Sequence, residues 1–343
     1  MTSSQPNASP SVQDQAPPID RERLASLIRL QLPEQEAITL LRQLTPETVT
    51  PTLLEDALDC MREACVPVKR PEVPVMDCCG TGGSGLSHFN TSTTVALILA
   101  AGGVPVVKFG NRGFSSASGS FDLLAQLGIG HQLDPQRVPD VVAACNVAFL
   151  FAPTCYPNLA GFSQLRKKLQ QRTLFNFLGP LLNPVQPAFR LLGVSHAGMQ
   201  DVMAQHLAQQ EYNDHSWLAH GADGLDEIAV HGPTRVVHIQ SGQTRQSELK
   251  PLGEVCQLPT GAHLPEENLA ILHHLLKGED QQSPYYQMVC MNAAAGFVVA
   301  GHTSTLHDGH REAQKLLSSG TVLKTLEQCR NAHEQFSLPG HAG

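Results

Sequence analysis

The stretch from Asp77 to Thr93 constrains the fold of this chain more than any other. It reads DCCGTGGSGLSHFNTST, follows the apolar residues VPVM, and leads into the helical pattern TSTTVALILAAGG. A second apolar segment, VPVVKFG, comes next. A strand, a glycine-rich turn, a helix and a strand in this order form a βαβ unit, whose two strands are parallel. The sequence therefore predicts a parallel sheet flanked by helices.

Other segments extend this pattern in both directions. VAFLFAP, FRLLGVS, HSWLAHG and TRVVHI predict further strands, whereas FDLLAQLGI and YYQMVCMNAAAGFVVAGH have the composition and length of helices. Upstream, apolar residues at intervals of three and four predict about three helices, and Thr50-Pro51 is typical of a helix start. We predict an α/β fold with a small helical domain and a mostly parallel central sheet. Its parts are a disordered tail over 1–18, a helical domain over 19–68 joined by helices from about 160–190, and an α/β domain over 70–343.

Composition and charge argue against several classes of protein. The formal net charge of −8 is unfavourable for binding nucleic acid through a broad basic face. We expect no membrane span and no signal peptide, because no apolar run is long enough and no basic start precedes one. The nine cysteines lie mostly in apolar surroundings. This pattern favours buried, reduced thiols and a cytoplasmic protein.

The glycine-rich turn is a candidate anion site. Backbone N–H groups and the positive end of a helix point at the same place in such a turn. Asn90, Ser92 and Thr93 add polar groups at the start of the helix. A plain tight turn would explain the glycines equally well, and their spacing fits neither the dinucleotide-binding nor the P-loop fingerprint.

The end of the next predicted strand favours the phosphate interpretation. Lys108, Asn111 and Arg112 lie where the ligands of parallel sheets collect. A loop rich in hydroxyl groups follows, with Ser115, Ser116, Ser118 and Ser120. Two neighbouring strands that end in such loops predict a site for more than one phosphate group.

Two further groups of charged residues fit a phosphate site. Asp226 and Glu227 are adjacent after Gly224, and carboxylates on a tight turn can share a magnesium ion. Alone, such a pair is usually exposed surface. Arg166 lies in the basic stretch LRKKLQQR, where a guanidinium group can bind a carboxylate through two parallel hydrogen bonds. A solvated helix face is the commoner explanation of a stretch of this kind.

Taken together, these stretches resemble the anthranilate phosphoribosyltransferase family. The similarity runs from about Pro74 to Cys329 and comprises, in order, GTGG with its following asparagine and Ser-Thr, the KFGNR stretch, SGS-x-D, RTLFNFLGPLLNP, GLDE-x-x-x-HGP and a late NAAA helix. Six motifs in one order rarely coincide by chance. The resemblance implies a nucleoside phosphorylase/phosphoribosyltransferase-like fold. It also implies magnesium-dependent transfer of a phosphoribosyl group from phosphoribosyl pyrophosphate to the amine of an aromatic acid, anthranilate in tryptophan biosynthesis.

The resemblance assigns residues to three parts of the site. The residues that would hold the donor are Gly80, Gly82, Gly83, Asn90, Ser92, Thr93, Lys108 and Ser120. Magnesium, expected as two ions, would be held by Asp226, Glu227 and the hydroxyl group of Ser92. The residues that would line the acceptor pocket are Asn111, Gly179, Phe109, Tyr156 and Arg166, with Arg166 on the acceptor's carboxylate.

Three positions depart from the family's usual pattern. Phe109 and Tyr156 stand where the family usually has histidines, and Ser84 stands where its glycine loop usually carries an aspartate. The first two positions belong to the acceptor pocket and the third lies beside the phosphates. We therefore expect a mostly intact donor site and an altered acceptor site.

Two other functions compete with this interpretation. A relative that acts on a different ring or nucleobase, in the manner of pyrimidine phosphorylases, is motivated by Phe109 and Tyr156. A non-catalytic member of the fold that binds nucleic acid is disfavoured by the net charge and by the retained acidic pair. The family commonly pairs through helices near the N-terminus, so a homodimer formed through these helices is expected.

Overall fold

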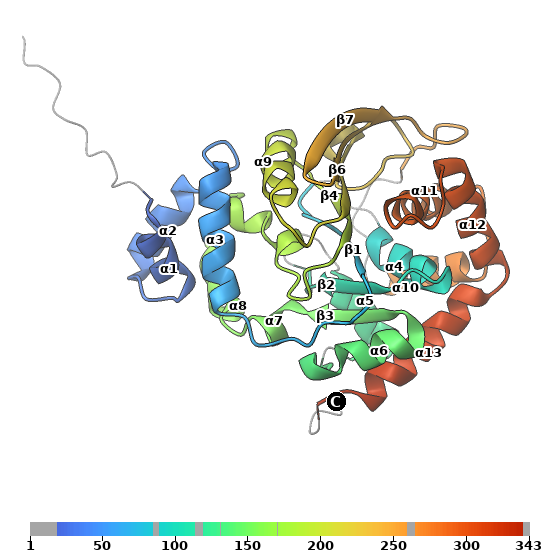
Figure 1. Ribbon diagram of the computed structural model, residues 1–343, viewed down its shortest axis with the longest axis horizontal. Coiled ribbons are helices and arrows are strands. Elements are labelled where there is room, and N and C mark those ends of the chain that lie inside the picture. The colour runs from blue at the N-terminus through green and yellow to red at the C-terminus, as the bar shows by residue number, and fades with distance from the viewer. Residues whose placement is uncertain are drawn as a thin grey trace, which may run out of the picture.

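A computed structural model describes residues 19–84, 89–113, 119–130, 132–169, 171–258 and 265–338. The predicted tail over 1–18 lies outside these ranges, as do Ser115, Ser116 and Ser118 of the hydroxyl-rich loop. The described chain folds into a sheet with helices on both faces and a group of helices at one end (Figure 1).

Three helices open the described chain, as the apolar spacing predicts. They are α1 (Arg21–Ile28), α2 (Glu34–Gln43) and α3 (Pro51–Glu63). The Thr50 side chain accepts a hydrogen bond from the Leu53 N–H (3.2 Å), and Pro51 fills the first helical position, where its missing N–H costs nothing. In Figure 1 these helices form the end of the molecule opposite to the C-terminal helices.

The central sheet has seven strands in the order β3-β2-β1-β4-β5-β6-β7. They are β1 (Met76–Gly80), β2 (Val106–Gly110), β3 (Val147–Phe151), β4 (Phe189–Gly193), β5 (His215–Gly221), β6 (Thr234–Gln240) and β7 (Gln243–Leu249). The first five are parallel, which confirms the predicted βαβ unit, and β6 and β7 add an antiparallel edge.

Strand β7 is the element that sequence patterning misses. Its residues QTRQSEL are mostly exposed, and it pairs only with β6. An edge strand whose faces are both largely in water carries no apolar alternation, so nothing in its composition distinguishes it from a loop.

The helices cover both faces of the sheet. Those after α3 are α4 (Thr91–Ala101), α5 (Ser120–Gln126), α6 (Val138–Cys145), α7 (Ala152–Cys155), α8 (Leu159–Lys167), α9 (Ala197–Ala208), α10 (Pro265–Leu276), α11 (Pro284–Val299), α12 (Leu306–Ser318) and α13 (Thr321–Gln335). Helix α4 packs between the sheet and α11, α12 and α13, which explains why it is apolar all round. The buried apolar residues of the N-terminal helices and of the sheet belong to one continuous cluster.

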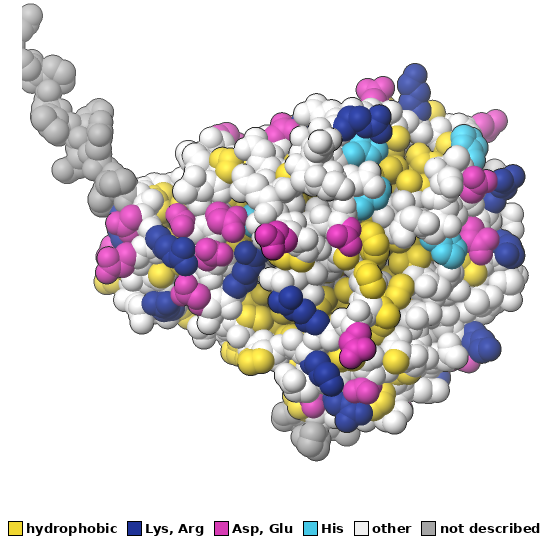
Figure 2. Space-filling model, viewed as in Figure 1, with side chains coloured by type: hydrophobic (Ala, Val, Ile, Leu, Met, Phe, Trp, Pro, Cys, Tyr) yellow, Lys and Arg dark blue, Asp and Glu magenta, His cyan; other side chains and the backbone are white. Residues whose placement is uncertain are grey.

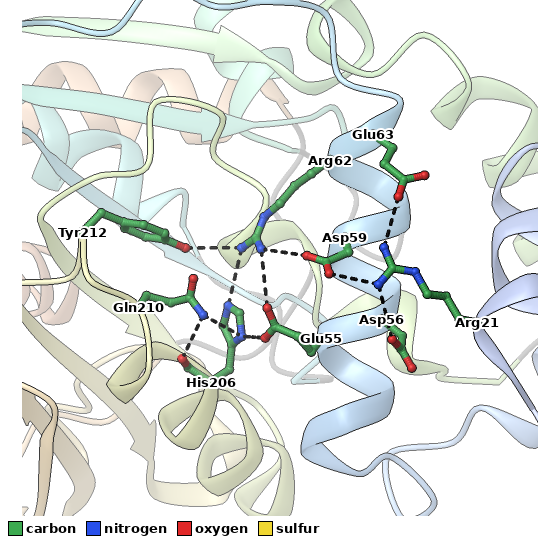
Figure 3. Close-up of polar contacts among 9 residues, drawn as sticks. All are labelled: Arg21, Glu55, Asp56, Asp59, Arg62, Glu63, His206, Gln210 and Tyr212. Atoms are coloured by element: carbon green, nitrogen blue, oxygen red, sulfur yellow. Dashed lines mark hydrogen bonds and ion pairs between the residues drawn. The ribbon is translucent and has the colours of Figure 1, made fainter.

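Helix α3 is attached to α9 by a polar network, shown in Figure 3. The imidazole of His206 on α9 bonds through Nδ1 to the Glu55 carboxylate, and its Nε2 lies 3.5 Å from the Arg62 guanidinium group. Arg62 also donates to the Tyr212 hydroxyl (3.3 Å). A neutral imidazole satisfies this arrangement, because it donates to Glu55 and accepts from Arg62.

Basic and acidic side chains alternate over the N-terminal helices in the view of Figure 2. Arg21, for example, forms ion pairs with Asp59 (3.3 Å) and Glu63 (3.1 Å).

Within the part of the chain that the structure describes, no helix combines the length and apolar character needed to cross a membrane.

Candidate active site

The predicted site residues gather at the carboxyl ends of β1, β2 and the strands beside them. Chain order reverses around β1, because β2 and β3 lie to one side of it and β4 and β5 to the other. Ligands of open α/β sheets bind at such a reversal, in the crevice beyond the strand ends. The loops that follow β1, β2, β4 and β5 therefore build the candidate site.

The loop after β1 is held closely by the protein itself. Gly82 and Gly83 have positive φ angles of 68° and 72°, which glycine adopts without strain. The Thr81 N–H donates to the Gly193 carbonyl (2.9 Å), and the Gly82 N–H donates to Asp226 Oδ2 (2.7 Å). The Gly82 amide, predicted to bind phosphate, is thus occupied by a carboxylate in this structure.

Gly80 ends β1 directly against the acidic pair. A Cβ atom at this position would lie 2.2 Å from Asp226 Oδ2, closer than any real contact. A Cβ atom added to Gly193, at the end of β4, would lie 1.6 Å from the backbone carbonyl oxygen of Asp226. Only glycine at both positions allows the turn after β5 to lie on the ends of β1 and β4.

Arg172 and Ser195 hold the other side of the loop. The Arg172 guanidinium group donates to the carbonyls of Gly83 (3.0 Å) and Gly82 (2.9 Å) and to Ser195 Oγ (2.8 Å). Ser195 Oγ donates to the Gly82 carbonyl (2.8 Å), and the Ser195 N–H donates to Thr81 Oγ1 (3.1 Å). The loop is therefore braced on its carbonyl side as well as its amide side.

The acidic pair is close enough for its charges to interact. Burial, and then the charge of Asp226, raises the pKa of Glu227 to about 8, against the opposing effect of Lys108. Two neighbouring carboxylates in a desolvated place are a poor arrangement without a cation. Their chemistry fits a divalent ion with oxygen ligands, such as magnesium.

Among the described residues, no three His, Cys, Asp or Glu side chains come together as a metal-binding group. Asp226, Glu227 and the Ser92 hydroxyl are therefore too few to form a complete coordination sphere. A magnesium ion held here would need substrate phosphate oxygens and water for its remaining positions, which is the usual arrangement for this ion.

Lys108 does not extend into open solvent as a phosphate ligand would. It is 2% exposed, and its Nζ donates to the Cys78 carbonyl beneath the glycine loop (2.9 Å). Asp77 is fully buried, and its pKa is raised because the effect of burial exceeds the opposing effect of the Lys108 charge. In this structure Lys108 supports β1 from inside the sheet.

The start of α4 faces the same crevice with uneven exposure. Asn90 is the N-cap residue, but its side chain makes no capping hydrogen bond, and Ser92 is half-buried in the first turn. Thr93 is fully buried, and its hydroxyl is closed off from solvent. In this structure only the backbone of Thr93 is available to a ligand, and its role in donor binding stays a prediction.

The loop after β2 is closed by α5. The Asp122 carboxylate accepts from the N–H groups of Gly113 (2.9 Å) and Gly119 (2.8 Å). Ser120 Oγ donates to the Asn111 carbonyl (3.1 Å). These bonds explain Gly119, Ser120 and Asp122 of the SGS-x-D motif as residues that hold the two ends of this loop together.

A pocket of about 210 Å³ opens next to the glycine loop. Its lining includes Phe109, Asn111, Arg166 and Gly179, four of the five residues predicted for the acceptor. Its apolar wall comes from Met61, Phe109, Ala152, Phe162, Phe175, Leu178, Pro180 and Leu182. Burial lowers the pKa of Arg166 to about 10. The pocket thus joins a ring-sized apolar space to a partly desolvated cation.

Tyr156 does not line this pocket, contrary to the prediction. Its ring is 2% exposed and packs edge-on behind Phe109, with ring centres 5.8 Å apart. Its hydroxyl donates to the Leu182 carbonyl (2.7 Å). Tyr156 supports the pocket wall from behind because α7 directs it into the core.

Sequence reasoning overlooked several residues of this site. Arg172 is the first residue of the motif RTLFNFLGPLLNP, and this position could have identified it. The sequence analysis expected one guanidinium group in this region and assigned it to Arg166. Ser195 follows a strand end and carries no other mark. Met61 enters the acceptor pocket from α3, 48 positions before Phe109 and 101 positions before Phe162, and only the packing of α3 reveals this.

Comparisons with known proteins agree with this geometry. The family model "Glycosyl transferase family, a/b domain" matches residues 72–323. The anthranilate phosphoribosyltransferase of Methylocella silvestris is 39% identical over 290 residues, covering 83% of this chain and 82% of that protein. That of Shewanella amazonensis is 37% identical over 321 residues, covering 90% and 92%.

Solved structures give the same result. The crystal structure of anthranilate phosphoribosyltransferase from Thermus thermophilus superposes with a TM-score of 0.82 at 34% identity, covering 92% of this chain and 94% of that one. The Saccharomyces cerevisiae enzyme in complex with phosphoribosyl pyrophosphate and magnesium superposes with a TM-score of 0.82 at 27% identity, covering 91% of each chain.

Proposed function

The chain belongs to the anthranilate phosphoribosyltransferase family, and from this premise we propose that it transfers the phosphoribosyl group of phosphoribosyl pyrophosphate to the amine of anthranilate, with release of pyrophosphate. One observation carries the proposal: a braced glycine loop, an acidic pair and a ring-sized pocket containing Arg166 meet at one crevice. The product is an intermediate of tryptophan biosynthesis.

The donor lies with its diphosphate over the glycine loop and the start of α4. The backbone N–H groups of Gly83 and Ser84 and the positive end of α4 oppose its negative charge. Asp226, Glu227 and Ser92 hold magnesium, which when bound neutralises charge on the leaving pyrophosphate. We propose two ions, the number that the resemblance to the family implies.

The acceptor lies in the 210 Å³ pocket with its carboxylate on Arg166. The apolar wall excludes water and fixes the ring, so that the amine faces the ribose C1 at the glycine loop. An aromatic amine is largely unprotonated at neutral pH, and no side chain is assigned as a general base. Rate acceleration then comes from positioning and from stabilisation of the leaving group.

Pyrophosphate release tests this function. The purified protein is mixed with phosphoribosyl pyrophosphate, magnesium and anthranilate, and a parallel reaction contains EDTA. We expect release that requires all three components. Release with a nucleobase but not with anthranilate would show that the acceptor is a nucleobase. Phe109 in the pocket wall would explain such a preference. No release with any aromatic acid or nucleobase would refute the proposal.

The remaining assignments concern the whole molecule. We propose a helical domain over 19–68, supported by α8, because α8 packs on α2 and the Leu174 N–H donates to the Leu44 carbonyl (2.7 Å). A homodimer through the N-terminal helices is proposed, and sedimentation velocity would test it. The nine unpaired cysteines support a cytoplasmic location.

A further inference from the structure

Arg172 is placed to act on the donor through the glycine loop. Its Nη1 and Nη2 atoms donate to two successive carbonyls, those of Gly83 and Gly82, and Nη2 also donates to Ser195 Oγ. The Phe177 ring covers one face of the guanidinium group, whose carbon lies 4.6 Å from the ring centre. A Cβ atom on Gly83 would lie 3.0 Å from that carbon. The guanidinium group is therefore packed against the loop backbone.

These contacts determine which way the loop presents its peptide groups. A carbonyl that points at a phosphate repels it, whereas a carbonyl that accepts from a half-buried cation such as Arg172 leaves its peptide N–H facing the other way. Arg172 holds the carbonyl side of the loop and Asp226 holds its amide side. Burial lowers the pKa of Arg172, and the charge of Asp226 opposes this. Successive N–H groups turned to one side of a turn form an anion-binding concavity.

The hydrogen bond between the Gly82 N–H and Asp226 cannot fix the orientation of the loop once the donor binds. Asp226 Oδ2 now holds the Gly82 N–H at 2.7 Å, where a phosphate oxygen would compete with it. If Asp226 turns to a metal ion, only the carbonyl side of the loop stays fixed. Arg172, with Ser195, is what fixes that side.

We propose that Arg172 is a positioning residue of the donor site, which keeps the Gly82 and Gly83 carbonyls turned away from the diphosphate so that the loop amides face it. This inference rests on the proposed function, because it takes phosphoribosyl pyrophosphate as the ligand. Arg172 is not among the residues that line the acceptor pocket, so its effect should be confined to the donor.

Binding of phosphoribosyl pyrophosphate with magnesium to Arg172→Met, measured by calorimetry, tests the proposal. Arg172→Met should raise the donor's Kd and KM about 10- to 100-fold, and leave the acceptor's KM at saturating donor within about threefold. Arg172→Lys keeps the charge but not the two-pronged geometry, so it should recover only part of the donor affinity. Guanidinium ion should partly rescue Arg172→Ala. Arg235→Met is the matched control, because Arg235 bridges β6 to Gln200 (2.6 Å) and Asp201 (2.5 Å) outside the site.

The outcomes separate this inference from the proposed function. Wild-type protein that binds no donor overturns both. Wild-type protein that binds donor while Arg172→Met binds it equally well overturns the inference alone. Full affinity in Arg172→Lys also overturns it, since that result indicates a direct charge contact with the anion. If Arg172→Met fails to fold, Arg172→Lys and Ser195→Ala decide, and wild-type donor affinity in both would contradict the proposal.

Discussion

The proposed donor and acceptor regions of this protein differ in what forms them. The donor region consists largely of backbone groups, held by Arg172 and Ser195 on one side and by Asp226 on the other. The acceptor region is a pocket walled by side chains from α3, β2, α8 and the segment after it. Two of the three departures from the family's pattern concern the acceptor region: Phe109 lines the pocket, and Tyr156 packs behind it.

This difference shows where substitutions can change a substrate. A backbone cradle depends on glycines that cannot gain a side chain, as Gly193 illustrates, where a Cβ atom would lie 1.6 Å from the Asp226 backbone carbonyl oxygen. A pocket wall can exchange one ring for another at the cost of repacking. We therefore expect variants of the donor site to abolish turnover, and variants of the acceptor site to alter selectivity.

The largest effect is expected from the acidic pair. Asp226→Asn combined with Glu227→Gln removes the metal's carboxylate ligands, so turnover should fall by about 1000-fold or more. The fold should survive, because burial of the Glu227 charge, and then repulsion by Asp226, raises the pKa of Glu227 to about 8, and the change removes both of these costs. Pyrophosphate release and thermal unfolding measure the two effects. Normal turnover in this variant would mean that the metal lies elsewhere.

A smaller and more selective effect is expected from Arg166→Ala. Loss of the partly desolvated guanidinium group should raise the KM for anthranilate by about 10- to 100-fold. The donor's Kd should stay near its wild-type value, and Arg166→Lys should be intermediate. Steady-state kinetics with each substrate varied in turn gives both numbers. A rise in donor Kd equal to the rise in acceptor KM would remove the distinction between the two regions.

Phe109→His tests how freely the acceptor wall can change. The ring is 5% exposed, so a polar imidazole there should lower the free energy of unfolding by about 1–3 kcal/mol. The kcat/KM for anthranilate should change by less than about tenfold, with the donor's KM unchanged. Phe109→Leu is the control that removes the ring pair with Tyr156 without adding a polar group. Chemical denaturation and acceptor kinetics measure the outcome.

The smallest effect is expected from pH at the joint between α3 and α9. Burial lowers the pKa of His206 while Glu55 opposes this, so the folded protein takes up the proton at lower pH than the unfolded chain does. The contribution of neutral His206 to the free energy of unfolding is thus fully present above about pH 6.5. It is lost as the pH falls through the pKa that His206 has in the folded protein. Because α3 carries Met61 of the acceptor wall, acceptor KM should rise more than donor KM at pH 5.5. His206→Gln should reduce the pH dependence of both stability and acceptor KM; an unchanged profile would exclude this histidine.

Much of the fold could be predicted from local pattern. The strands and helices around the glycine loop are strongly apolar, and the parallel arrangement of β1 and β2 follows from the helix between them. The edge strand β7 could not be predicted, because its residues face water. Among the candidate site residues, Phe109, Asn111, Arg166 and Gly179 meet in one pocket as expected, whereas Tyr156 and the Thr93 side chain turn into the core.

The sequence by itself determined which chemical groups are present and near which strand ends they lie, because motif spacing fixes the distance of a residue from its own strand. Only the tertiary structure decided what those groups contact. It placed the Gly82 amide on Asp226, 144 positions away in the chain, and the Arg172 guanidinium group on the Gly82 and Gly83 carbonyls. Such contacts depend on the order and packing of the strands, and no local pattern of residues encodes them.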